Sequence, residues 1–222
     1  MNNISVFDVI GPIMIGPSSS HTAGALKIAL LAGKMIKEEI VSVKFILYGS
    51  FAETYRGHGT DRALLAGIMG FNTDDFRIKD SYSIADKKNL LYFFEVNKTN
   101  MEVHPNTVDI IITNETGKVV TVRGISLGGG NISIRNINGV DISLSGNYNT
   151  IVVKQIDTPG VAAHITKVLS LNKINIAFMS IYREVKGENA YTIIEADDEV
   201  TQDIVTHLEK NSFIESAILL EV

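Results

Sequence analysis

The sequence contains no cysteine among its 222 residues. This absence excludes disulfides, thiolate nucleophiles, thiolate zinc sites and iron–sulfur clusters ligated by cysteines of this chain. The five histidines offer no replacement, because no two of them share the short spacing of a metal-ligand motif. We therefore expect no metal site within this chain.

Positive charge and long apolar runs are also scarce. The chain has 20 Lys and Arg against 25 Asp and Glu, and a net charge of -5 gives no broad attraction to phosphate backbones. The N-terminus lacks the basic segment and apolar core of a secretory signal, and the apolar stretch 28–33 is far shorter than the ~20 residues that span a bilayer. We expect a cytoplasmic protein that binds neither nucleic acid nor membrane.

The patterning that is present indicates an α+β protein with two domains, at residues 1–147 and 150–222. The polar stretch 145–149 separates them, since small polar residues favour turns. In the first domain the patterns predict a short strand or helical turn at 5–10, helices at 23–40 and 61–69, and strands at 41–48, 90–97, 107–114 and 118–125. Asp61 is the expected N-cap of the second helix and Gly70 its stop, and 114–117 is an expected hairpin turn.

The second domain has the clearer pattern. Strands are predicted at 150–156, 175–184, 190–196 and 214–221, and helices at 161–171 and 201–210. The order β-α-β-β-α-β is that of a ferredoxin-like fold.

A serine-rich loop before the first helix is the strongest site signal. Ser18, Ser19 and Ser20 are followed by His21 and Thr22. Hydroxyls and free amides at a helix start can bind an anionic group, and histidine is the side chain best suited to general acid or base work near pH 7. The alternative is an ordinary serine cap of a helix.

Three further loops carry polar groups of the same kind. Residues 55–62 contain His58 and Arg62, 103–107 contain His104, and 126–131 form a glycine-rich segment. In that last segment Ser126, Gly128 and Gly129 offer amides that can cradle a carboxylate. A structural or interface role for His58 and Arg62, and a plain flexible turn at 126–131, remain open. The remaining histidines, His164 and His207, are expected at ordinary helix positions.

The second domain resembles the ACT domain. The resemblance lies in the Asp-Thr-Pro-Gly turn at 157–160 and the asparagine-containing turn at 172–175. It implies an amino-acid ligand at Asp157, Gly160 and Asn175, held in part by the first amides of the helix that starts after Pro159. Two alternatives stay open, that Asp157 and Pro159 only cap the helix, or that the domain only dimerises.

The whole chain resembles the β subunit of the iron–sulfur-dependent L-serine dehydratases. The segments that carry the resemblance are 5–8 with 11–12, 16–22, 57–61, 104–107, 126–130 and the ACT-like tail. The first half is thereby similar to the allosteric substrate-binding domain of some phosphoglycerate dehydrogenases.

This resemblance implies a lyase that converts L-serine to pyruvate and ammonia with a [4Fe-4S] cluster as Lewis acid. The cluster is expected on a separate α subunit, which agrees with the missing cysteines. His21 is the expected catalytic residue at the interface with that subunit, while Ser18, Ser19, Ser20 and Thr22 are expected to hold the serine carboxylate or to shape the loop. An amino-acid-sensing regulatory protein is the alternative, and a homodimer through either domain is left open. A pyridoxal-phosphate enzyme has no support, since no lysine stands in a recognisable Schiff-base context.

Overall fold

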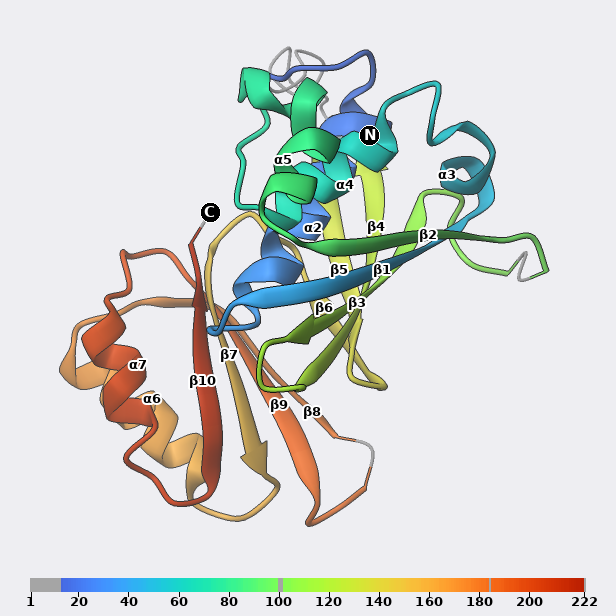
Figure 1. The fold of residues 1–222 in the computed structure, drawn as a ribbon. Helices are drawn as coiled ribbons and strands as arrows, with labels where there is room; N and C mark the ends of the chain where they lie inside the picture. The colour runs from blue at the N-terminus through green and yellow to red at the C-terminus, as the bar shows by residue number, and fades with distance from the viewer. Residues whose placement is uncertain (1–12, 100–101, 184, 222) are drawn as a thin grey trace, which may run out of the picture. The chain divides into compact units, whose positions relative to one another are not determined.

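The chain forms two compact units, residues 1–139 and 140–222, each with its own β-sheet (Figure 1). The computed structural model describes residues 13–99, 102–183 and 185–221. It confirms the α+β class. The strand or helical turn expected at 5–10 lies outside the described residues. The division between the units precedes the residue 147 to 150 boundary expected from sequence, which stays a prediction.

The first unit contains a mixed sheet whose strands follow the order β2-β1-β3-β4-β5. β1 pairs with β2 in parallel and with β3 in antiparallel register, and the remaining pairs are antiparallel. In chain order the elements are the π-helix η1 (Ser19–Gly24), α2 (Ala25–Lys34), β1 (Ile40–Tyr48), α3 (Gly49–Thr54), α4 (Thr60–Ile68), the 3-10 helix η2 (Phe76–Asp80), α5 (Ser81–Lys87), β2 (Leu91–Asn97), β3 (Thr107–Asn114), β4 (Val119–Gly128) and β5 (Asn131–Ile137).

The core of this unit lies between the sheet and the helices that cover one of its faces, among them α2 and α4 (Figure 1). Alternate residues of β1, namely Val43, Phe45 and Leu47, are fully buried there, as period-2 patterning of a strand requires. β3 contributes Ile110 and Ile112 to the same layer. The packed layer fixes the ends of β1 and α2, which carry the polar loops of interest.

The helix predicted at 23–40 is wrong at its C-terminal end. α2 ends at Lys34, and the next residues turn so that β1 can begin at Ile40. Two bonds to the β3–β4 turn hold this segment away from a helix. The Asn114 side-chain amide donates to Glu38 at 3.0 Å, and the Glu115 N–H donates to the Glu39 carbonyl at 3.0 Å. Tertiary contacts therefore override local helix propensity here.

The predicted cap of α4 is also wrong. The helix starts at Thr60, and its N-cap is Gly59 in the left-handed region at φ 68°. Asp61 lies inside the first turn, where its carboxylate accepts from the Arg62 N–H at 2.8 Å and the Tyr82 hydroxyl at 2.8 Å.

The strands predicted at 41–48, 90–97, 107–114 and 118–125 are confirmed to within three residues at their ends, as is the hairpin turn at 114–117. Short elements were not predicted. These are α3, η2, α5, β5 and β6 (Val140–Leu144). The glycine segment 126–131 is a tight β-hairpin rather than a loop, because β4 extends to Gly128 and β5 begins at Asn131.

The second unit confirms the ferredoxin-like prediction. After β6 come β7 (Asn149–Ile156), α6 (Val161–Leu171), β8 (Ile176–Arg183), β9 (Asn189–Ala196), α7 (Gln202–Leu208) and β10 (Ile214–Leu220). The sheet order is β10-β7-β9-β8, with antiparallel neighbours. α6 and α7 lie on one face of it (Figure 1), and Ile165, Leu169 and Leu208 pack there against Ile151 and Ile194.

Across the described parts of the chain, no helix combines the length and apolar character needed to cross a membrane.

Candidate active site around His21

The serine-rich loop forms the first turn of a continuous helix. The Ser18 side chain is the N-cap and accepts the His21 N–H at 3.1 Å, while its carbonyl accepts the Thr22 N–H at 2.9 Å. The π-helix η1 runs directly into α2, because Gly24 has right-handed helical angles. π-helical turns are rare in proteins overall, but those that occur often lie at functional sites. The expected cap is therefore present, and it also holds His21 at the helix start.

Both ring nitrogens of His21 face serine hydroxyls. Nδ1 lies 3.2 Å from the Ser20 Oγ and 3.4 Å from the Ser18 Oγ. Nε2 lies 2.9 Å from the Ser50 Oγ, which the sequence did not predict. The structure thus brings the predicted Ser18 and Ser20 together with His21, while Ser19 begins η1. It also adds a hydroxyl from a segment about 30 residues further along the chain.

Two aromatic rings enclose the His21 imidazole. The Phe51 ring meets it edge-on at 5.4 Å between centroids, and the His58 ring does so at 4.8 Å. Burial, and secondarily the proximity of His58, lower the pKa of His21 from its ordinary 6.5. The lowered pKa favours the neutral form of His21 at pH 7, in which one ring nitrogen can accept a proton.

The predicted residues Thr22 and His58 connect the serine-rich loop to the segment 55–62. The Thr22 hydroxyl is buried and donates to the His58 carbonyl at 2.9 Å. The His58 Nδ1 is buried and has no hydrogen-bond partner among residues 13–99, 102–183 and 185–221. A buried nitrogen without a hydrogen-bond partner costs folding free energy. His58 therefore has one polar atom beside His21 that is available to a ligand.

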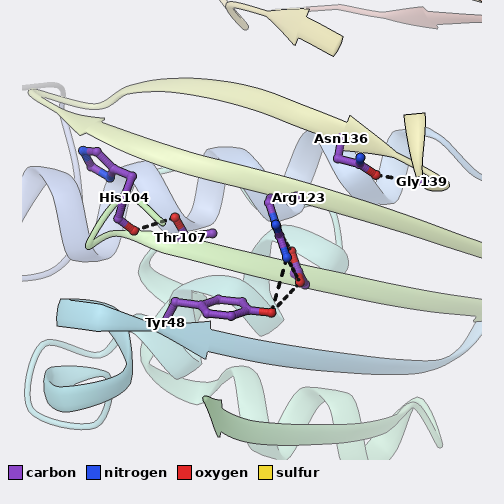
Figure 2. A network of polar contacts seen from close by, with 7 residues as sticks. Tyr48, His104, Thr107, Arg123, Asn136 and Gly139 are labelled. Atoms are coloured by element: carbon purple, nitrogen blue, oxygen red, sulfur yellow. Dashed lines mark hydrogen bonds and ion pairs between the residues drawn. The ribbon is translucent and has the colours of Figure 1, made fainter. Parts of the chain in front are cut away.

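The segment around His104 supports the site through its backbone. The Phe51 N–H donates to the Pro105 carbonyl at 3.3 Å, and a Cβ placed on Gly49 would come within 2.8 Å of Pro105. The Thr107 hydroxyl donates to the His104 carbonyl at 2.6 Å (Figure 2). The His104 ring itself is exposed, and its Nδ1 accepts only the nearby Asn106 N–H in the bonds described, at 3.2 Å.

A polar network fixes the end of β1 just before Ser50. The Tyr48 hydroxyl donates to Asp109 at 2.7 Å, and Arg123 donates to both carboxylate oxygens at 2.6 and 2.7 Å. Figure 2 shows the Tyr48 hydroxyl and the Arg123 guanidinium turned toward one another across the sheet. Burial and the Asp109 carboxylate raise the pKa of Tyr48, and Asp109 raises that of Arg123. The sequence reading missed this network, because its members lie far apart in the chain.

The predicted Ser126 lies behind the serine loop. Its side chain is fully buried, and its Oγ has no partner within the described residues. A Cβ on Gly24 would overlap this hydroxyl, so the two segments pack together only because residue 24 is glycine. Gly128, the last residue of β4, and Gly129, in the β4–β5 turn, have φ values of 98° and 61°, which glycine adopts without strain. η1 contacts both β4 and β5.

Arg62, His164 and His207 make their described contacts with other residues than His21. Arg62 donates to the Lys79 carbonyl at 2.8 Å. His164 lies 3.3 Å from the Leu208 carbonyl, and the His207 Nδ1 lies 2.8 Å from the Asp203 carbonyl. The last two are ordinary helix positions, as expected.

In the second unit, Asp157 and Gly160 lie together at one end of the sheet. The Asp157 carboxylate accepts from Arg183 at 2.5 Å and from the Gly187 N–H at 3.1 Å, and these bonds lower its pKa. Gly160, at φ 95°, is the N-cap of α6. Asp157 therefore braces the β8–β9 turn, and the simple helix-cap alternative is wrong. Because α6 starts at Val161, Pro159 also precedes the cap.

Asn175 is not brought to that end. It precedes β8, whereas Asp157 meets Arg183 at the end of the same strand. Eight strand residues separate the two positions by roughly 20 Å or more. Asn175 instead donates through its side chain to Asp197 at 2.6 Å and through its N–H to Asp198 at 2.7 Å. One small ligand within this unit does not contact both Asp157 and Asn175.

These features define a class of protein: an α+β unit with a histidine–hydroxyl cluster, joined in one chain to a ferredoxin-like unit. Comparison with known proteins agrees with both parts. Residues 5–90 match the family described as Serine dehydratase beta chain, and residues 149–213 match the ACT domain.

Three relatives illustrate the similarity. The probable L-serine dehydratase, beta chain, of Bacillus subtilis (strain 168) is 44% identical over 206 residues, which cover 93% of each chain. The L-serine dehydratase, beta chain, of Peptoniphilus asaccharolyticus is 42% identical over 205 residues, 92% of each chain. The D-3-phosphoglycerate dehydrogenase of B. subtilis is 24% identical over 196 residues, 88% of this chain and 37% of that protein.

The chain therefore belongs to the serine dehydratase beta chain family. The family resemblance seen in the sequence is confirmed.

Proposed function

We propose that this chain is the beta subunit of an L-serine dehydratase, a lyase that forms pyruvate and ammonia from L-serine. The observation that carries this proposal is the near full-length identity to chains named L-serine dehydratase, beta chain. The His21 cluster supports it, because it joins a neutral imidazole to several hydroxyls in one half-buried site.

A [4Fe-4S] cluster does not fit this chain. All 222 residues lack cysteine, and no group of three or more His, Asp or Glu side chains in the described residues is placed to hold a metal ion. Cluster ligation by thiolates would have to come from another chain. We therefore propose that the cluster belongs to a separate alpha subunit, and that this chain is inactive without it.

The work of this chain is to bind and orient serine. Within the proposal, the hydroxyls of Ser18, Ser19 and Ser20 receive the substrate carboxylate, aided by Thr22, which ties the loop to His58. His21 accepts or returns a proton at one of its ring nitrogens, since its lowered pKa favours the neutral ring at pH 7. The Gly128 and Gly129 amides, in the turn after Ser126, are proposed to complete the carboxylate site.

The test of this proposal is anaerobic reconstitution of the chain with its candidate alpha chain, followed by measurement of pyruvate from L-serine. His21→Ala should lower kcat/KM by about 10²-fold or more if the imidazole moves a proton. Lys173→Ala, on the second unit, is the matched control and should leave kcat/KM unchanged. A His21→Ala enzyme with native kcat/KM would show that His21 is not part of the active site.

We further propose that the ACT domain binds an amino acid at the end marked by Asp157 and Gly160. The first amides of α6 follow a glycine with open space around it, which leaves room for a carboxylate. Calorimetry of the full chain with L-serine tests this. Asp157→Asn should weaken the heat signal and Lys173→Ala should retain it. A titration of the intact chain without heat would contradict the proposal.

Homodimerisation through either domain, a cytoplasmic location and a second domain beginning at 150 stay predictions. Light scattering of the purified chain tests the first of these.

A further inference from the structure

The histidine of the candidate site has no free nitrogen. Ser18 and Ser20 face Nδ1, and Ser50 faces Nε2 at the shortest of the three distances, 2.9 Å. A neutral imidazole donates from one nitrogen and accepts at the other. A serine hydroxyl can donate or accept, so it is compatible with either tautomer. The Ser50 hydroxyl on Nε2 therefore restrains how the ring is turned.

The backbone around Ser50 is held on both sides. Ser50 lies in the first turn of α3, between two residues whose backbones contact Pro105. Its own carbonyl accepts the Thr54 hydroxyl at 2.8 Å. Tyr48, two residues earlier, is fixed by the bond to Asp109. The backbone that carries the Ser50 hydroxyl is therefore fixed by these contacts.

We propose that Ser50 is a positioning residue for His21, whose hydroxyl holds Nε2 and so fixes the orientation of the ring. The contact of His21 with Phe51, the next residue of α3, restrains the same ring from its edge. This inference rests on the proposed function of His21, because a positioned ring matters for the reaction only if His21 takes part in it.

The first experiment reads the ring directly in the isolated chain. The ¹⁵N shifts of the two His21 ring nitrogens, measured by long-range proton–nitrogen correlation, report which nitrogen carries the proton. Ser50→Ala should move the Nε2 resonance, because it removes the hydroxyl at that nitrogen, while Ser50→Thr, which keeps the hydroxyl, should resemble the native chain. Ser83→Ala, at an exposed position of α5, is the control and should change neither. An unchanged Nε2 resonance in Ser50→Ala overturns the proposal.

The second experiment uses the reconstituted enzyme. Ser50→Ala should lower kcat by roughly 10-fold or more with KM nearly unchanged, because misplacing a catalytic group affects the chemical step. Ser50→Thr should restore most of kcat, which a folding defect would not predict. A Ser50→Ala enzyme with native or higher kcat would mean that Ser50 only shields Nε2 and gives way to substrate, and would overturn the proposal.

The failure of the proposed function is distinguishable from this. A fully active His21→Ala enzyme would refute the role of His21 in the reaction. The ring-nitrogen measurement would still decide whether Ser50 holds the imidazole.

Discussion

Loss of the Asp109 carboxylate should lower the free energy of unfolding, because this residue holds the Tyr48–Arg123 network at the end of β1. Asp109 is 9% exposed and accepts three hydrogen bonds, one from Tyr48 and two from Arg123. Asp109→Asn keeps the shape but removes the charge and turns an NH₂ group toward other donors. Hydrogen bonds to charged groups contribute about 1.5–3 kcal/mol each. Since the Arg123 side chain is 35% exposed, water offsets part of the loss, and we expect about 2–3 kcal/mol of destabilisation.

The matched control is the Lys44–Glu95 pair of the same sheet. Its atoms are 2.6 Å apart, but the side chains are 41% and 52% exposed. Glu95→Gln should therefore cost only about 0.2–1 kcal/mol. The assay is urea unfolding of the intact chain followed by far-ultraviolet circular dichroism. If Asp109→Asn costs no more than Glu95→Gln, the reasoning that burial makes this network stabilising is refuted.

Three further predictions follow from the packing and the titrating groups. Gly24→Ala should destabilise the chain by about 1–3 kcal/mol in the same assay, because its methyl group overlaps the Ser126 hydroxyl, and an unchanged midpoint would contradict the packing. His58→Gln should raise the pKa of His21 toward 6.5 in an NMR titration, since it removes the second cause of the lowering; a pKa that falls would exclude that cause. Asp157 has a lowered pKa in the folded chain, so its stabilising effect is present above 3.8 and is lost as pH falls through the folded value. The NMR shift of the Gly187 amide, which donates to this carboxylate, should follow the Asp157 titration with a midpoint below pH 3.8. A midpoint above that value would show that the bond does not form.

The sequence predicted most of the second unit because each of its elements has a strong local pattern. α6 was predicted at its observed bounds, 161–171, since its apolar residues repeat at helical spacing and a Pro-Gly turn precedes it. The short helix α3 was missed, because six residues give too little periodicity to read. β5 was missed although Ile132 and Ile134 alternate with polar residues, a signal that was present.

The candidate site was predictable only in its local part. Ser18, Ser20 and His21 are neighbours in the chain, and their cap geometry follows from residue type. Ser50 comes near His21 only because β1 and α3 are placed by the sheet and by Pro105. The opposite locations of Asp157 and Asn175 likewise depend on strand direction, which residue types alone do not reveal.

We propose that this chain contributes a substrate site but no cluster, and so acts only with a partner. The most direct measurement is pyruvate formation from L-serine by this chain alone, by the candidate alpha chain alone, and by both mixed anaerobically. We expect pyruvate only from the mixture. Pyruvate from this chain alone, or none from a mixture whose alpha chain carries its cluster, would contradict it.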